Sequence, residues 1–141
     1  MHEPAFYNTP SGKVICFIRT ANFDDHLVTA ESTDNGHTWS AWQKRNIIGH
    51  PYTPIRLPDN RVLLVYGYRH EPFGIRARLL DPECSNIDTA EEFIIRDDGL
   101  GTDLGYPWGC VLPDGRVLVT YYFWTNDGIR HIAGSVLEID A

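Results

Sequence analysis

The sequence predicts an all-β fold, a fragment of a β-propeller with about three four-stranded antiparallel blades, the last of them incomplete. Two observations carry this prediction. A turn pattern of proline, then Ser or Asp, then Gly or Asn recurs three times at intervals of roughly 50 residues, a spacing typical of propeller blades. Runs rich in Val, Ile, Leu, Tyr and Phe flank each turn, and such runs favour strands.

Each unit begins with a strand, the turn and a second strand. The turns lie in Thr9–Ile15, Leu57–Leu63 and Leu112–Leu118. Proline presets the first corner of a tight turn, and Gly or Asn accepts the positive φ of the next corner. Third strands are expected at His26–Ser32, Gly74–Leu80 and Arg130–Leu137. Fourth strands are expected near Gln43–Ile47 and Glu91–Arg96, and the third unit ends before reaching one.

The predicted blades span residues 1–48, 49–103 and 104–141 and form one partial domain. Only Asn86–Glu92 is a weak helix candidate. Repeats of the WD and kelch types are disfavoured, because neither a Trp-Asp strand end nor a Gly-Gly pair recurs. Three blades cannot close an ordinary ring, so the outer blades would expose sheet edges. Self-association through those edges is therefore a predicted property.

The composition limits the classes of partner. The 141 residues carry a net charge of −7, with 43% hydrophobic and 22% charged residues, which is typical of a soluble globular domain. There is no basic stripe, so nucleic acid is not an expected partner. No apolar run is long enough to span a bilayer, so no membrane is expected, and the start MHEPAFYNTP lacks the features of a secretory signal. The compartment stays open.

The cysteines and histidines give no metal motif. The three cysteines are too few and too scattered for a zinc site, and two of them lie in apolar runs where burial is expected, Cys16 and Cys110. Three histidines lack ligand spacing and are expected to be polar surface residues: His50, His70 and His131. The sequence therefore predicts neither a metal nor a cofactor.

The segment ESTDNGHTW, residues 31–39, lies where the third strand of the first unit turns toward the fourth. Asp34 can accept hydrogen bonds from its own loop, Gly36 tolerates a positive φ, and Trp39 can pack its ring against the sheet. Turn chemistry thus accounts for the segment. A structural role is favoured over a catalytic one, and over a calcium loop, because only one carboxylate lies inside the turn. In the second unit the matching pattern has decayed to Leu80–Ser85.

The pattern Ser32-x-Asp34-x-Gly36-x-Thr38-Trp39 fills every position of the Asp-box, also called the BNR repeat, and so resembles the sialidase (neuraminidase) superfamily. The resemblance implies a six-bladed propeller, with this chain similar to the C-terminal half of the catalytic domain. It also implies a glycoside hydrolase that releases terminal sialic acid, or a related acidic sugar, from glycoconjugates. Members of this family are often secreted.

Two further segments resemble motifs of that family. The start HEPAF, followed by a glycine turn and a strand ending in Arg19, is similar to a blade whose glutamate partners the nucleophile. That resemblance makes Glu3 the partner and Arg19 one of three arginines that bind the substrate carboxylate. The segment GYPWGCVLPDG is similar to the strand with the nucleophilic tyrosine, which would be Tyr106. Here Pro107 replaces the family's Ser, and Tyr122 stands where a Glu is usual.

A further substrate-binding arginine is expected at Arg69 or Arg76. By the internal repeat Arg19 corresponds to Gly67, and Arg69, two residues on, shares that face of the strand, so Arg69 is preferred. The chemistry is coherent. A carboxylate on the anomeric carbon of sialic acid repels a carboxylate nucleophile but not a neutral tyrosine. A glutamate can supply the base that a phenol of pKa about 10 needs.

Other interpretations stay open from the sequence. Glu3 can be an exposed terminal residue, the arginines solvated strand ends, and Tyr106 a packing aromatic. The family's general-acid aspartate and first arginine have no counterpart here, so the chain alone is expected to be inactive or severely impaired. One alternative is a non-catalytic propeller segment that binds a glycan or a protein. Another is an Asp-box glycosidase with paired carboxylates recruited from Glu71, Asp97 and Asp98.

Overall fold

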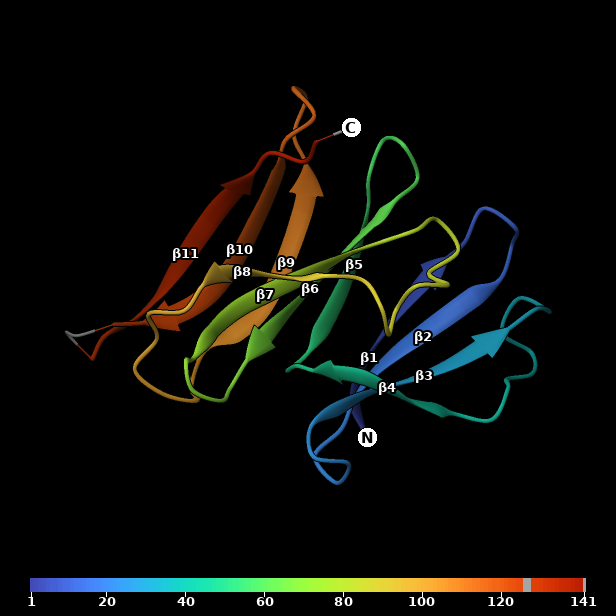
Figure 1. Ribbon diagram of the computed structural model, residues 1–141, viewed down its shortest axis with the longest axis horizontal. Coiled ribbons are helices and arrows are strands. Elements are labelled where there is room, and N and C mark those ends of the chain that lie inside the picture. The colour runs from blue at the N-terminus through green and yellow to red at the C-terminus, as the bar shows by residue number, and fades with distance from the viewer. Residues whose placement is uncertain (126–127, 141) are drawn as a thin grey trace.

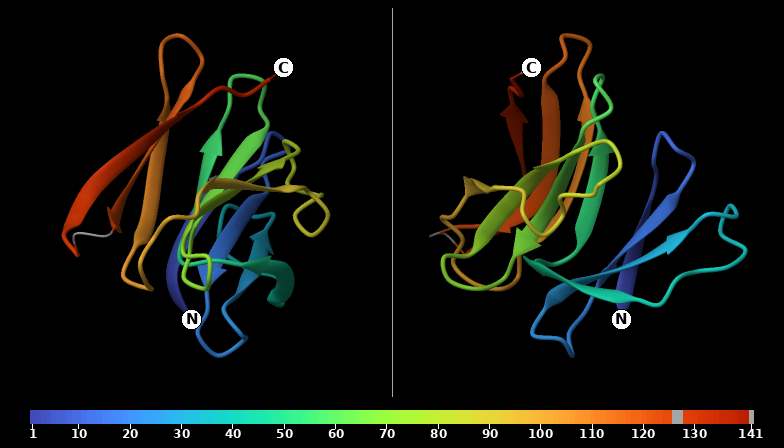
Figure 2. Two further views of the ribbon diagram at one scale, coloured as in Figure 1. Left: turned by 60° about the vertical axis from the view of Figure 1, so that its left-hand side comes forward. Right: turned by 45° about the vertical axis from the view of Figure 1, so that its right-hand side comes forward.

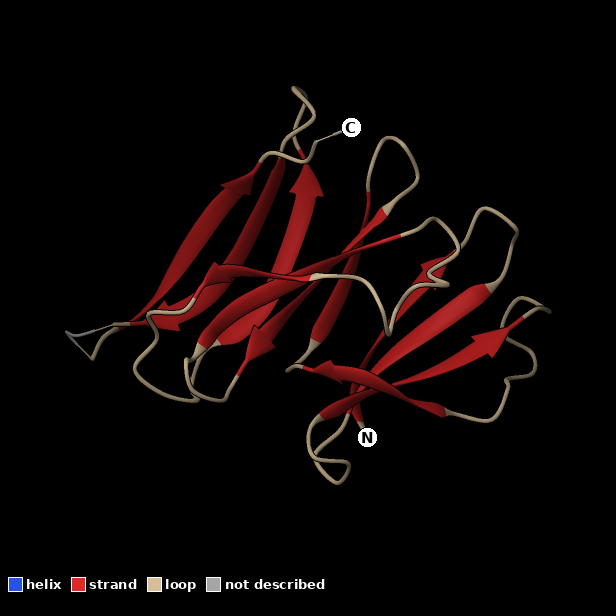
Figure 3. Ribbon diagram, in the orientation of Figure 1, coloured by secondary structure: helices blue, strands red, loops and turns tan. Residues whose placement is uncertain are grey.

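The computed structural model describes residues 1–125 and 128–140, which form three antiparallel sheets without a helix (Figure 1, Figure 3). The first sheet has the order β1-β2-β3-β4, with strands His2–Asn8, Val14–Arg19, His26–Ser32 and Gln43–Ile48. The second has the order β5-β6-β7-β8, with strands Tyr52–Arg56, Val62–Tyr68, Gly74–Leu80 and Glu92–Arg96. The third has the order β11-β10-β9, with strands Gly105–Val111, Val117–Trp124 and Arg130–Leu137 for β9, β10 and β11.

The all-β class and the repeating unit are confirmed. The predicted third strands have the observed bounds, and the fourth strands differ by one residue, β4 ending at Ile48 and β8 beginning at Glu92. The helix candidate at Asn86–Glu92 is wrong: hydrogen-bonded turns run from Asn86 to Thr89 and Ala90, and the chain then enters β8. The described residues form no closed barrel, and the closure of a propeller ring stays a prediction.

The three predicted turns have one geometry. In the first, the Thr9 N–H donates to the Lys13 carbonyl at 2.8 Å and the Gly12 N–H to the Thr9 carbonyl at 3.0 Å. The corresponding bonds recur at 2.9 and 3.0 Å in the second turn and at 2.7 and 2.9 Å in the third. The corner residues Gly12, Asn60 and Gly115 all have positive φ, of 90°, 70° and 88°. Residues that tolerate this conformation were the signal in the sequence, and they stand where the conformation is needed.

The second sheet lies between the other two (Figure 2). One core cluster joins the first and second sheets, with Phe17, Leu27 and Tyr66 among its fully buried members. A second cluster joins the second and third sheets through residues such as Val65 and Phe123. The first strands of the units, β1, β5 and β9, pack beside one another in that order. Side chains from strands far apart in the sequence therefore meet along this line.

The outer face of the third sheet is apolar but uncovered among the described residues. Alternation along β9 and β11 directs Trp108 and Ile132 outward, with 70% and 77% of each residue exposed. Cys110 lies on the same face and is exposed, so the expectation of its burial is wrong, whereas Cys16 is buried as expected. No described segment forms a helix of the length and apolar character that a membrane crossing requires.

Candidate active site

Three of the predicted site residues meet where β1, β2 and β9 come together. The Tyr106 hydroxyl donates a short hydrogen bond to Glu3 Oε1. The Arg19 guanidinium donates from Nη1 to Glu3 Oε2 at 2.7 Å and to the Tyr106 hydroxyl at 3.4 Å. Tyr106 is 47% exposed, so the residue lies at the surface of the described chain. The structure thus brings Glu3, Arg19 and Tyr106 together as one hydrogen-bonded cluster.

The backbone at two members of this cluster is strained. Glu3 has a φ of 48° and Tyr106 a φ of 50°, a region that side chains larger than glycine's rarely adopt. Each residue lies where the register of strand pairing shifts. Glu3 lies between His2 and Ala5, where the pairing of β1 with β2 shifts, and Tyr106 lies in β9 opposite the shift between Thr120 and Tyr122 of β10. A bulge of this kind redirects a side chain, here toward the partner across the sheets. Non-glycine residues in such conformations cluster at functional sites.

The charges within the cluster fix its protonation state. Partial desolvation raises the pKa of Glu3, but the hydrogen bonds from Tyr106 and Arg19 and the nearby Arg charges outweigh it, so the pKa lies below its usual value. The hydrogen bond to Glu3 is the main cause that raises the pKa of the Tyr106 phenol. At neutral pH Glu3 is therefore ionised and Tyr106 keeps its proton, which points at the carboxylate.

Arg69 joins the cluster from the end of β6. Its guanidinium carbon lies 5.6 Å from the centroid of the Tyr106 ring. Its Nε donates to the Leu104 carbonyl at 3.0 Å and its Nη2 to the Tyr122 hydroxyl at 3.1 Å. Arg69, the arginine preferred from the sequence, therefore lies beside Tyr106, and its binding of a substrate carboxylate stays a prediction. Arg76 lies elsewhere: it pairs with Glu92 at 2.7 Å and stacks on Tyr68 at 3.5 Å.

A second row of polar residues lies behind Arg69, and the sequence did not predict it. The Tyr122 hydroxyl donates to Asp103 Oδ1 at 3.0 Å, and Arg130 Nε donates to Asp103 Oδ2 at 2.8 Å. This chain of bonds fixes the direction of the Arg69 guanidinium. The one signal in the sequence was Tyr122. It stands at the position where the family that the sequence resembles usually has Glu, which indicates a polar side chain at that position of the strand.

The expectation that the histidines lie at the surface is wrong for His50. His50 is 3% exposed, whereas His70 is exposed as expected. The two ring Nε2 atoms lie 3.1 and 3.0 Å from Asp25 Oδ2, and the three possible ligand atoms lie within 4.8 Å of one another. The sequence did not reveal this cluster because its members come from three separate loops.

The alternative of a glycosidase with paired carboxylates gains little support from the structure, since Asp98 is bound to the nearby Arg96 at 2.7 and 2.8 Å.

The Asp-box residues form a hydrogen-bonded turn. Asp34 accepts the Thr38 N–H at 2.8 Å and the Thr38 hydroxyl at 2.5 Å, and the Ser32 hydroxyl at 2.7 Å. The Ser32 oxygen in turn accepts the Gly36 N–H at 2.9 Å. The Trp39 indole N–H donates to the Gly36 carbonyl at 3.1 Å. The Thr38 bonds hold the pKa of Asp34 at about 2. All of these contacts lie within the loop, so the structural role of the segment accounts for its chemistry.

The second unit keeps the central contact of this turn. Asp81 accepts the Ser85 N–H at 3.1 Å and the Ser85 hydroxyl at 2.5 Å, the same pair of bonds over the same spacing as at Asp34. The pattern there has lost its Gly and Trp but not its aspartate and hydroxyl. The prediction that the Asp-box has decayed in the second unit is therefore correct for the amino-acid identities but not for the hydrogen bonds of Asp81.

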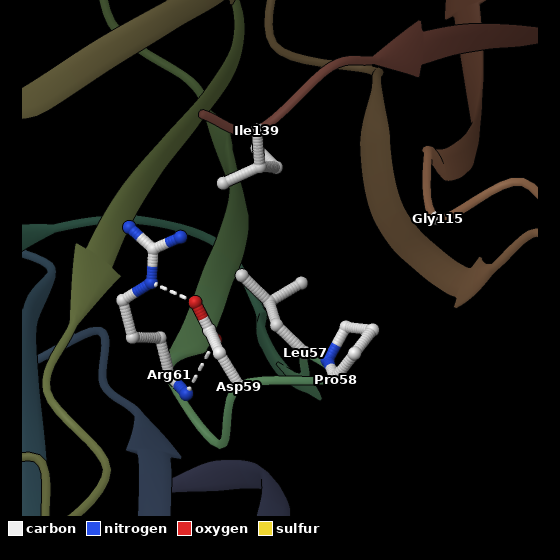
Figure 4. A pocket seen from close by; sticks show the side chains of 6 residues that line it. All are labelled: Leu57, Pro58, Asp59, Arg61, Gly115 and Ile139. Atoms are coloured by element: carbon white, nitrogen blue, oxygen red, sulfur yellow. Dashed lines mark hydrogen bonds and ion pairs between the residues drawn. The ribbon is translucent and has the colours of Figure 1, made fainter. Parts of the chain in front are cut away.

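Three cavities formed by the described residues lie away from the Glu3–Tyr106 cluster. The largest of these three, of about 590 Å³, is an apolar groove between β8 and β11, lined among others by Phe93, Ile95 and Val136. A smaller one of about 170 Å³ lies between the β5–β6 turn and Ile139, where Arg61 Nε donates to Asp59 at 2.6 Å (Figure 4).

Comparison with known proteins gives a solved relative without an assigned activity. No family model and no curated protein matches this chain. A crystal structure of a protein of unknown function from Dyadobacter fermentans DSM 18053 is similar to it, with 54% sequence identity and a TM-score of 0.95. The match covers 98% of this chain and 38% of that protein, so this chain spans less than two thirds of its relative.

Proposed function

We propose that this chain is part of a sialidase-like glycoside hydrolase and contributes the nucleophile, its base and two arginines that bind the sugar carboxylate. One observation carries the proposal. Tyr106, Glu3 and Arg19 are hydrogen-bonded to one another although they come from three strands and Glu3 and Tyr106 are 103 positions apart in the sequence. A packing tyrosine would need neither a carboxylate on its hydroxyl nor a strained backbone.

The proposed chemistry follows from the geometry. The Tyr106 oxygen attacks the anomeric carbon, its proton passes to Glu3, and the bond to the departing alcohol breaks. Water then hydrolyses the glycosyl-tyrosine, and the configuration is retained. Protonation of the departing alcohol comes from a group outside this cluster, as the resemblance already implied. The 141-residue chain is therefore expected to bind the sugar but to turn it over poorly.

Arg19 links substrate binding to the base. In the structure it stabilises the ionised form of Glu3 and so weakens it as a base. A substrate carboxylate engages arginine through paired, charge-assisted hydrogen bonds. When it draws the Arg19 guanidinium toward itself, Glu3 loses part of that stabilisation, and its pKa rises. Binding of the acidic sugar thus prepares Glu3 to accept the Tyr106 proton.

The same proposal includes the architecture. Three consecutive antiparallel sheets whose first strands adjoin are the arrangement of neighbouring propeller blades, and the sheets correspond to the three predicted blades. The longer Dyadobacter relative leaves room for the remaining blades. The proposed site lies on the line of first strands, where a propeller has its axis.

Hydrolysis and binding assays test the proposal. Isothermal titration of N-acetylneuraminic acid should show binding that Arg19→Gln weakens by about 10–100-fold, the cost of one charge-assisted contact. Arg116→Gln is the matched control, because Arg116 lies at an exposed turn and forms its ion pair with Asp114, away from the Glu3–Tyr106 cluster. N-acetylglucosamine, which has no carboxylate, should not bind.

A fluorogenic sialoside tests turnover. An N-terminally extended form should hydrolyse it, and Tyr106→Phe should abolish this activity. If the extended form is inert and neither Tyr106→Phe nor Arg19→Gln alters sugar binding, the sialidase proposal fails. The non-catalytic binding segment is then the better interpretation.

A further inference from the structure

His50 has no role in the chemistry above, yet its backbone touches both strands that carry site residues. Its N–H donates to the Gly67 carbonyl at 2.9 Å. Its own carbonyl oxygen lies so close to two glycines that an added Cβ would come within 2.3 Å at Gly67 and 3.1 Å at Gly105. Arg69 follows Gly67 by two residues, and Tyr106 follows Gly105 directly. A shift of His50 is therefore passed to both side chains.

The ring of His50 is held at both nitrogens. The Arg69 backbone N–H donates to Nδ1 at 3.3 Å, and Nε2 lies 3.1 Å from Asp25 Oδ2. Since Nδ1 accepts a proton donor, the proton of the neutral ring has to lie on Nε2, from which it is donated to Asp25. Burial, together with the charges of Arg19 and Arg69, lowers the pKa of His50 although Asp25 raises it, so the ring is neutral at pH 7.

This pattern of hydrogen bonds favours a proton, and not a metal ion, between the side chains of Asp25, His50 and His70. Asp25, His50 and His70 have the atom types and spacing of a divalent-cation site. A histidine that binds metal through Nε2, however, donates its Nδ1–H to an acceptor. Here Nδ1 faces the Arg69 N–H, which is a donor. The cation would also lie near the charges of Arg19 and Arg69, whose influence extends to His50.

We propose that His50 is a positioning residue, anchored by Asp25, whose Nδ1 holds the Arg69 backbone so that its guanidinium lies over Tyr106. The importance of this role for catalysis rests on the proposed function, whereas the hydrogen bond from the Arg69 N–H to His50 Nδ1 does not depend on it. His70 shares the Asp25 oxygen at 3.0 Å and stacks on His50 with 5.6 Å between ring centroids, so it completes the anchor at the surface. Asp25 lies in a turn with a φ of 60°, a conformation that Asp adopts more readily than most residues.

Two variants separate the two ring contacts. Asparagine places a carbonyl oxygen near the position of Nδ1, so His50→Asn keeps an acceptor for Arg69 and loses Asp25. Glutamine places its amide near Nε2, so His50→Gln keeps a donor to Asp25 and loses the acceptor. Circular dichroism should show that both variants fold. Amide hydrogen exchange at Arg69 should be about fivefold or more faster in His50→Gln and nearly unchanged in His50→Asn.

Nitrogen NMR of the wild-type histidines supplies a readout that needs no sugar. The expected result is a neutral His50 ring protonated at Nε2 at pH 7, unaltered by one equivalent of Zn²⁺. An Nδ1–H tautomer, stoichiometric Zn²⁺ binding, or equal Arg69 exchange in the two variants would overturn the proposal. Weaker binding of N-acetylneuraminic acid by His50→Gln than by His50→Asn extends the role to the site. If the wild type binds no sugar while the exchange and NMR results hold, the proposed function fails and the positioning role stands.

Discussion

The hydrogen bond between Tyr106 and Glu3 gives the sharpest test of the site. It is a phenol-to-carboxylate bond, and charge-assisted bonds of this kind contribute about 1.5–3 kcal/mol when well shielded. Tyr106 is 47% exposed and the Glu3 side chain 34%, so solvent screens part of this energy. We expect a coupling free energy of about 1 kcal/mol between the two residues.

A double-mutant cycle measures this coupling. The free energy of unfolding in urea at pH 7 is compared for the wild type, Tyr106→Phe, Glu3→Gln and the double variant. The double variant should lose about 1 kcal/mol less than the sum of the single losses. Tyr7→Phe is the control, because the Tyr7 hydroxyl bonds to Pro82 and Arg56 and its effect should add to that of Glu3→Gln. A Tyr106–Glu3 coupling below about 0.3 kcal/mol, the usual error of additivity, refutes the cluster as described.

The same coupling should depend on pH with a definite sign. The pKa of Glu3 is lowered in the folded state from its ordinary 4.5. A carboxylate of this kind contributes stability above the unfolded-state pKa, and the contribution is lost as the pH falls through the lower, folded-state pKa. The coupling should therefore be complete at pH 7 and vanish in acid, and Glu3→Gln should make the acid limb of stability less steep. A coupling that persists unchanged when Glu3 is protonated contradicts the assignment of an ionised carboxylate.

Three further outcomes are expected. Asp34→Ala should accelerate limited proteolysis and amide exchange at Thr38, because it removes the carboxylate oxygens that accept the Thr38 N–H and hydroxyl. In the wild type the same loosening of the turn should begin as the pH falls below about 3.8 toward 2, where the Asp34 carboxylate is protonated. A thiol reagent should modify Cys110 rapidly and the two buried cysteines slowly, and Cys110→Ser should remove the fast phase. Gly67→Ala should lower the free energy of unfolding by about 2 kcal/mol, since its Cβ would come within 2.3 Å of a backbone oxygen, whereas Gly134→Ala, with 3.5 Å to its nearest neighbour, should change it little.

The elements predicted from the sequence were those with a local cause. A proline corner followed by Gly or Asn fixes a turn whatever surrounds it, so all three turns and the strands beside them could be located. The candidate residues Glu3, Arg19 and Tyr106 could be named because the Asp-box at Ser32–Trp39 resembles that of the sialidases, and two further segments resemble motifs of that family. Alternation along the strand then favoured Arg69 over Arg76, and the structure places Arg69 beside Tyr106.

What could not be predicted depends on contacts between sheets. His50 reads as an ordinary polar loop residue, and only its meeting with Asp25 and Gly67 buries it. Cys110 lies in an apolar run, but alternation directs it to the uncovered face of the third sheet. No pattern in the chain distinguishes a covered face from an uncovered one, because that depends on which neighbours the sheet packs against.

The backbone strain at Glu3 and Tyr106 lies in the first strands of the first and third units. Both residues precede a proline and stand the same number of residues before the turn of their unit. The second unit shows that the repeat does not require the distortion. Its first strand β5 pairs with β6 without any shift of register, and no residue of β5 has a positive φ.

The middle strand instead braces its strained neighbour, because the Thr53 hydroxyl donates to the Pro107 carbonyl at 2.7 Å, directly after Tyr106. A positive φ at a large side chain costs about 1–2 kcal/mol, which relaxation to a regular strand like β5 would recover. The two distorted strands are the ones whose side chains meet, so the distortion serves to bring the Tyr106 phenol and the Glu3 carboxylate into contact.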